Sequence, residues 1–71
     1  MAHGWLHTVY REGQWINEIE GGGPMTKHES RSEAIESGRD TARLLGTVHV
    51  THSISGEVRD TRGFGPVAIK R

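Results

Sequence analysis

One strong helix signal lies near the middle of this 71-residue chain, and it limits what the chain can fold into. Residues 30–33, Ser-Arg-Ser-Glu, match the capping box, in which a serine hydroxyl accepts from the backbone N–H three residues later. This predicts a helix over about residues 31–45, with Gly46 where a glycine commonly ends a helix. Packing against a sheet is expected for its apolar stripe, which consists of Ala34, Ile35, Gly38, Ala42 and Leu45.

Segments typical of β-strands lie on both sides of this helix. Residues 6–11 and 14–20 are rich in Trp, Val, Tyr, Thr and Ile and flank the turn signal Glu12-Gly13, so they predict a hairpin. Residues 47–54 alternate apolar and polar side chains, and the turn Ser55-Gly56 separates them from a short strand at 57–61. The expected order is therefore strand, strand, helix, strand, strand.

Residues 21–24, Gly-Gly-Gly-Pro, are the strongest break in the sequence. Because glycine is entropically costly in a regular element and proline has no N–H, we expect a flexible connection here. The simplest fold is α+β with two layers, a ββαββ unit whose antiparallel four-stranded sheet carries one helix on one face. We expect a single small domain over residues 1–71, with an ordered core of about 5–65 and a tail, 66–71, that forms an edge strand or is frayed.

Composition narrows the function classes. Nine Lys+Arg balance nine Asp+Glu, cysteine is absent, and hydrophobic residues make up 32%. The lack of cysteine excludes disulfides. The sequence has neither an apolar run of about 18 residues nor a signal-peptide pattern. We therefore expect a cytoplasmic protein without a membrane partner. A core this small supplies only about 3–5 kcal/mol, and zero net charge leaves no long-range repulsion between copies, which favours self-association.

Seven short motifs follow one another along the chain: His7-Thr8-Val9, Gly13-x-Trp15, Ser32-Glu33-Ala34-Ile35, Ala42-Arg43, Val48-x-Val50-x-His52, Gly56-x-Val58 and Gly63-Phe64-Gly65. Their order and spacing resemble the DUF2188 family of small prokaryotic proteins of unknown function. The chain departs from the family pattern at Tyr10, Asn17, Gly38 and residues 21–24. The resemblance implies the ββαββ order and a cytoplasmic prokaryotic or phage source, and it brings no catalytic residues.

One helix covers only one face of the expected sheet, so the other face is left open. An open face that carries Val9, Tyr10 or Ile16 favours a partner, and a second copy of the chain is the commonest one. Trp5 and Phe64 complete the interface candidates, because large aromatic side chains are frequent interface anchors. The leading hypothesis is a small non-enzymatic binding module that self-associates through a sheet face or an edge strand, with a dimer as the first expectation and another protein as a further partner.

A weak nucleic-acid-binding protein is the alternative hypothesis. Arg59 and Arg62 give the C-terminal third a modest positive bias, and Arg39 and Arg43 line one side of the predicted helix. Acidic residues alternate with these arginines and the net charge is zero, so an ordinary solvated surface is the favoured interpretation. Nucleic acid is therefore not the expected partner.

Five histidines are the remaining unusual feature of the composition. His49 and His52 are three residues apart, so a regular strand places them on opposite faces, where they cannot share one metal ion. His7 and His52 meet only if their strands are neighbours. Because no motif of a metal site or of a catalytic nucleophile is present, we expect no metal, no cofactor and no enzymatic activity.

Overall fold

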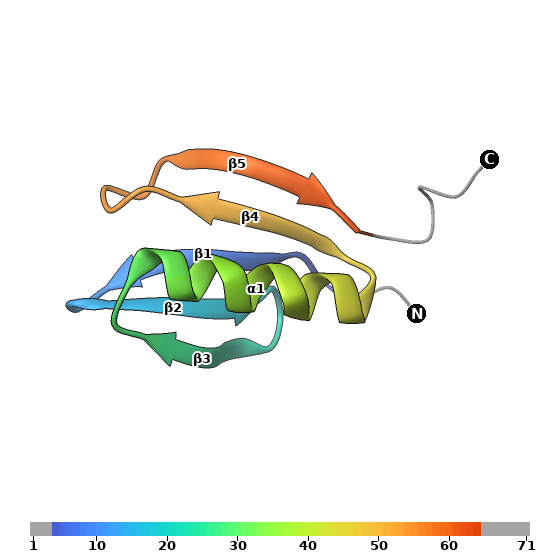
Figure 1. Ribbon diagram of the computed structural model, residues 1–71, viewed down its shortest axis with the longest axis horizontal. Coiled ribbons are helices and arrows are strands. Elements are labelled where there is room, and N and C mark those ends of the chain that lie inside the picture. Colours follow the sequence, from blue (N-terminus) through green and yellow to red (C-terminus); the bar gives the residue numbers. More distant parts are fainter. Residues whose placement is uncertain (1–3, 65–71) are drawn as a thin grey trace.

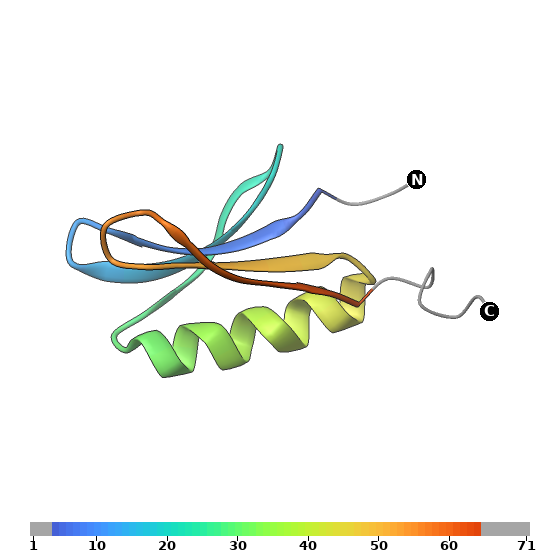
Figure 2. The ribbon, with the colours of Figure 1, turned by 90° about the horizontal axis from the view of Figure 1, so that it is seen from above.

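The computed structural model describes residues 4–64, which form one helix and five strands. In chain order the elements are β1 (Leu6–Arg11), β2 (Gln14–Ile19), β3 (Gly23–His28), α1 (Arg31–Leu45), β4 (Val48–His52) and β5 (Val58–Gly63). Figure 1 shows α1 lying across one face of the sheet, and Figure 2, turned by 90°, shows the two layers from above. The α+β class with a single helix, expected from the sequence, is confirmed over these residues.

α1 begins and ends where its sequence signals place it. The Glu33 backbone N–H donates to Ser30 Oγ at 3.2 Å, as the capping box predicts. Gly46 adopts the left-handed conformation, with φ 68°, and the Thr47 backbone N–H donates to Ala42 O at 3.0 Å. The buried side of the helix consists of its smallest residues, Ala34, Gly38 and Ala42, which bring its backbone close to the sheet.

The sheet has five strands in the order β3-β2-β1-β4-β5, so the predicted antiparallel sheet of four strands is wrong in detail. The pairs β1–β2, β2–β3 and β4–β5 are antiparallel, whereas β1 and β4 are parallel neighbours. The additional strand explains the parallel pair. Three strands followed by a helix that returns along the sheet leave the chain running in the direction of β1 when it enters β4.

The segment expected to be a flexible connection, residues 21–24, supplies the start of β3, the additional strand. Gly21 and Gly23 both have φ 82°, a conformation that glycine adopts readily, and they close the turn between β2 and β3. Pro24 is tolerated in β3 because β3 is an edge strand, where one side needs no ladder donor. The glycines therefore break the chain only at the turn, and the strand resumes directly after it.

The strand registers divide the sheet into two faces. The face that α1 covers carries Leu6, Thr8, Trp15, Asn17 and His49, each at most 8% exposed. The opposite face, here called the open face, carries His7, Val9, Ile16, Val50 and His52. Within β4 the polar residues, rather than the valines, lie beneath the helix, and His49 and His52 lie on opposite faces as predicted.

Two predictions concern the C-terminal part of the chain. The strand expected at 57–61 is β5, which extends to Gly63. The tail at 66–71 lies outside the described residues. Over residues 4–64, α1 is neither long enough nor apolar enough to cross a bilayer.

Candidate functional site

A buried polar cluster fixes the helix on the sheet. Thr8 Oγ1 donates to Asn17 Oδ1 at 2.5 Å, and His49 Nε2 lies 2.7 Å from the same hydroxyl oxygen. Since the threonine has a single hydroxyl proton, His49 donates to it through Nε2. Asn17 Nδ2 in turn donates to Ala34 O in the helix at 2.9 Å. We call Thr8, Asn17 and His49 the buried polar cluster.

Gly38 in α1 lies directly over the buried polar cluster. A Cβ atom at this position would lie 2.7 Å from His49 Nε2, 2.8 Å from Asn17 Oδ1 and 2.9 Å from Thr8 Oγ1, closer than side chains tolerate. Burial lowers the pKa of His49, and the charge of Arg39 lowers it further, so the imidazole is neutral near neutral pH. The cluster therefore orients the two layers, with a neutral imidazole at its centre near neutral pH.

A second polar chain runs across the open face. Glu20 Oε2 lies 2.6 Å from His7 Nε2, His7 Nδ1 lies 2.9 Å from His52 Nε2, and His52 Nδ1 lies 3.2 Å from Gly56 O. The two histidines meet because β1 and β4 are neighbours, as the sequence analysis required. The hydrogen bond from His7 and one from the Trp5 backbone lower the pKa of Glu20.

The two ends of this polar chain are hydrogen-bond acceptors. Glu20 and the Gly56 carbonyl accept hydrogen bonds, so each imidazole directs an N–H outward to its own acceptor. The ring centroids are 5.1 Å apart and the nitrogens 2.9 Å apart, so the nitrogens lie nearly on the line between the rings, as in a hydrogen bond. The arrangement is therefore a continuous hydrogen-bonded chain that runs from Glu20 through both imidazoles to the Gly56 carbonyl.

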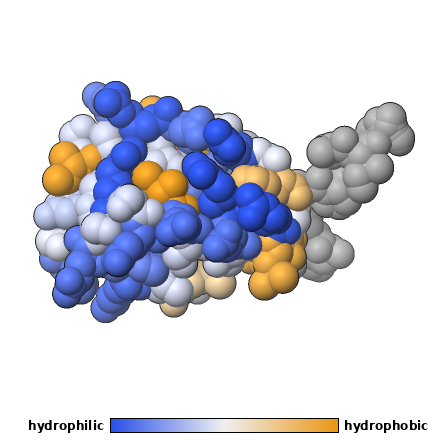
Figure 3. All heavy atoms as spheres, viewed as in Figure 1, coloured by the Kyte–Doolittle hydropathy of each residue, from blue (hydrophilic) through white to orange (hydrophobic). Residues whose placement is uncertain are grey.

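The five interface candidates do not form one surface. Val9 and Ile16 are opposite neighbours on the open face, but Ile16 is only 8% exposed. Tyr10, expected on the open face, instead lies on the helix side, with its ring centroid 5.1 Å from that of Trp15. Trp5, 47% exposed, precedes β1, and the ring of Phe64 lies 5.2 Å from the Arg43 guanidinium carbon. Figure 3 shows only small, separate apolar patches on the helix side.

Three of the four arginines proposed for nucleic acid lie on the helix side of the sheet. Arg62 is opposite His49 in the ladder, and the charge of Arg39 lowers the pKa of the same histidine. Arg43 lies over the ring of Phe64. Arg59 falls at the irregularity in the β4–β5 ladder. The helix thus has a basic side toward β5.

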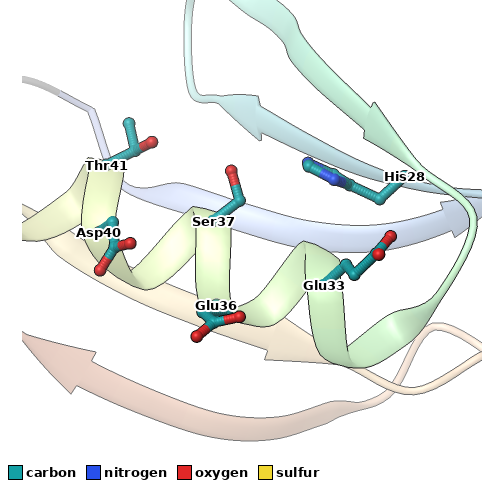
Figure 4. Close-up of a pocket in the computed structure, with 6 residues that line it drawn as sticks. All are labelled: His28, Glu33, Glu36, Ser37, Asp40 and Thr41. Carbon is teal, nitrogen blue, oxygen red and sulfur yellow. The ribbon is translucent and has the colours of Figure 1, made fainter.

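The other side of the helix is acidic. Figure 4 shows an open groove between α1 and β3, with a volume of about 520 Å³, whose lining residues are His28, Glu33, Glu36, Ser37, Asp40 and Thr41. Across residues 4–64, no three His, Cys, Asp or Glu side chains are arranged to hold a metal ion. The groove is therefore a solvated polar surface, and its Asp40 lies 3.4 Å from Nη1 of Arg43.

The two edges of the sheet differ. β5 is an edge strand whose six residues are all exposed, and it lies beyond β4, away from the helix (Figure 1). β3, at the other edge, contains Pro24, whereas the ladders of both edge strands carry one irregularity each. Proline is a feature that blocks the addition of a further strand. The β5 edge is therefore the more accessible of the two.

Comparison with known proteins places this fold in a family. A family model described as "Uncharacterized protein conserved in bacteria (DUF2188)" matches residues 6–64, which is most of the chain. The chain belongs to the DUF2188 family. Searches of curated proteins and of solved structures found no significant match. DUF2188 membership confirms the resemblance seen in the sequence, and it assigns no activity to any residue.

Sequence reasoning about this DUF2188 protein missed the buried polar cluster. The one signal available was the expectation that Asn17 and Gly38 both depart from the family pattern. The structure shows that the two departures face each other, since a Cβ atom on Gly38 would meet the Asn17 side chain. The sequence alone does not show this pairing, because the two residues lie in different elements.

Proposed function

We propose that this protein is a small, non-enzymatic binding module of the bacterial cytoplasm that self-associates through the β5 edge of its sheet. The observation that carries the proposal is the exposure of every residue of β5, an edge strand that the helix leaves clear. An edge strand presents a row of backbone N–H and C=O groups that a further strand can pair with. The lack of cysteine supports a reducing compartment.

A thin core supports self-association further. The buried apolar residues over 4–64 are Leu6, Trp15, Ile16, Ala34, Ala42 and Val50, and two of these six are alanines. Pairing two β5 strands adds backbone hydrogen bonds, each worth about 0.5–1.5 kcal/mol net. A few such bonds are comparable to the stability that a core of this size supplies. Another protein that offers an exposed strand is a second kind of partner for the same edge.

The open face supports a non-enzymatic role. His7 and His52 use all four ring nitrogens on each other, on Glu20 and on Gly56. A histidine that activates a nucleophile needs one ring nitrogen directed at that nucleophile. The histidine chain is therefore better suited to joining β1, β4 and the Ser53–Gly56 turn than to proton transfer with a substrate.

Sedimentation equilibrium of the full chain tests self-association directly. We expect a mass that rises from one chain to two as the concentration increases through the micromolar range. A mass that stays at one chain up to about 1 mM, the dissociation constant of the weakest specific complexes, overturns the proposal. Light scattering on the same samples distinguishes a dimer from an open series of larger assemblies.

A second candidate function is weak nucleic-acid binding, which the basic side of the helix favours. The charges of Arg39 and Arg62 both act on His49, and the Phe64 ring lies beside Arg43. Such a site would bind phosphates and lose affinity steeply with salt. Fluorescence anisotropy of labelled single-stranded DNA and RNA tests it: binding at low salt that an Arg39→Glu variant loses supports this function, and constant anisotropy at low salt excludes it.

A further inference from the structure

β5 carries two opposite charges on one face of its exposed edge. Asp60 Oδ2 lies 3.5 Å from Arg62 Nε, and both side chains are more than half exposed. In the ladder Asp60 is opposite Thr51 and Arg62 is opposite His49, so both project on the helix side of the sheet. A strand that pairs with this edge therefore meets a negative and a positive side chain two residues apart.

The symmetry of a dimer restricts how two β5 strands can meet. Antiparallel pairing of identical edge strands needs a two-fold axis perpendicular to the sheet. This axis lies midway between the two strands, where one residue is opposite its own copy; that residue is called the centre. The β4–β5 ladder is irregular where Arg59 interrupts it, so the regular part of the strand starts at Asp60. Gly63 is the last residue of β5, so a centre there would pair the strand with residues beyond its end; the centres that remain are Asp60, Thr61 and Arg62.

Charge decides among these three centres. An axis at Asp60 or at Arg62 places that charged side chain opposite its own copy, and like charges directly opposite are destabilising. An axis at Thr61 instead places Asp60 opposite Arg62 of the second copy, twice, with the two threonines opposite each other. Cross-strand pairs of opposite charge and of threonines are both favourable. This register alone turns every charged pair at the centre into an attractive one.

We propose that two copies pair β5 to β5, antiparallel, about a two-fold axis at Thr61, with reciprocal Asp60–Arg62 contacts. The inference rests on the proposed self-association and adds its surface, symmetry and register. The helix packs against β1, β2, β3 and β4, so the two helices lie on the same face of the combined sheet, separated by both β5 strands.

Charge-reversal variants at these exposed positions test the register. Asp60→Arg places arginine opposite arginine twice, and Arg62→Asp places aspartate opposite aspartate twice. We expect each variant alone to weaken dimerisation by at least about tenfold in sedimentation equilibrium. Arg59→Asp is the matched control, because it changes the net charge as much as Arg62→Asp but meets the uncharged Gly63 of the second copy. Circular dichroism checks that every variant is folded.

Mixing the two variants gives the most specific result. An Asp60→Arg chain and an Arg62→Asp chain are expected to form a heterodimer, because both cross-strand pairs are then arginine with aspartate. The double variant D60R/R62D is expected to dimerise like the wild type for the same reason. Native mass spectrometry counts the species.

The failure of this register is distinguishable from the failure of self-association. A wild type that stays monomeric overturns both. Two results overturn the register and leave self-association standing. In the first, the wild type dimerises and all three single variants dimerise equally well. In the second, the single variants dissociate and form no heterodimer on mixing. A Thr61–Thr61 contact between copies, measured by isotope-filtered NMR on the unaltered protein, provides an independent check, and its absence in a dimer overturns the register.

Discussion

At the scale of single residues, the fit between Gly38 and the buried polar cluster determines how closely the helix approaches the sheet. Thr8, Asn17 and His49 satisfy one another and the Ala34 carbonyl, so this polar centre avoids the cost of unpaired buried groups. The space they occupy is available only because position 38 has no side chain. A polar centre and a glycine in the middle of a helix are thus two parts of one arrangement.

Gly38→Ala is therefore expected to destabilise the fold, although alanine is the better helix former. The added methyl group overpacks the cluster, which costs about 1–3 kcal/mol, more than the roughly 1 kcal/mol that helix propensity returns. Urea unfolding measures the difference. Glu36→Ala, at an exposed position of the same helix, should change stability by no more than about 0.5 kcal/mol. A Gly38→Ala variant more stable than the wild type would contradict the packing argument.

The lowered pKa of His49 makes stability depend on pH. The unfolded chain, with an ordinary histidine pKa near 6.5, binds a proton at this site more readily than the folded chain does. The stabilisation is therefore fully present above pH 6.5 and is lost as the pH falls through the window below it. His49→Gln keeps a donor for Thr8 and removes this titration. Urea unfolding between pH 5 and 7 should show a shallower loss in the variant, and equal slopes would refute the assignment.

At the scale of elements, the helix depends on local signals and the sheet does not. Ser30 and Gly46 define the ends of α1 through backbone contacts within a few residues. β3 depends instead on two turn glycines and on pairing with β2, which lies earlier in the chain. Elements set by local contacts are therefore the ones whose bounds can be taken directly from sequence.

The cap gives a prediction with a control in the same first turn, Ser32, whose hydroxyl lies 3.5 Å from that of Ser30. Ser30→Ala removes the hydroxyl that accepts from the Glu33 N–H, and such losses cost about 1 kcal/mol. Ser32→Ala removes a hydroxyl from an exposed position two residues later and is expected to be nearly neutral. Thermal and urea unfolding of the two variants give the comparison. Equal effects would mean that the cap contributes no more than an ordinary surface hydroxyl.

At the scale of the whole molecule, the charges are balanced in number, and several opposite charges are paired on the surface. The net charge is zero, yet one side of the helix faces an acidic groove and the other carries the arginines. In the proposed dimer both basic sides flank the two β5 strands. Self-association and anion binding would thus use neighbouring parts of the same surface.

Association of a protein with so small a core should be visible in its thermal stability. A partner that binds only the folded state stabilises it by mass action, so the unfolding temperature of the wild type is expected to rise with protein concentration. Differential scanning calorimetry at concentrations about 100-fold apart tests this, since such a ratio is worth about 2.7 kcal/mol when binding is limiting. Arg62→Asp should unfold at a temperature that depends less on concentration, and an unfolding temperature constant in the wild type argues against a folded dimer.

The sequence by itself determined the helix, its caps, both hairpin turns and the opposite orientation of His49 and His52, because each follows from contacts or alternation within a few residues. The tertiary structure decided what depends on direction and neighbours: that β3 exists, that β1 and β4 are parallel, and that polar residues of β4 lie beneath the helix. It also brought His7 to His52 and left β5 as the accessible edge. These features join residues more than 40 positions apart or depend on strand order, and no local pattern carries that information.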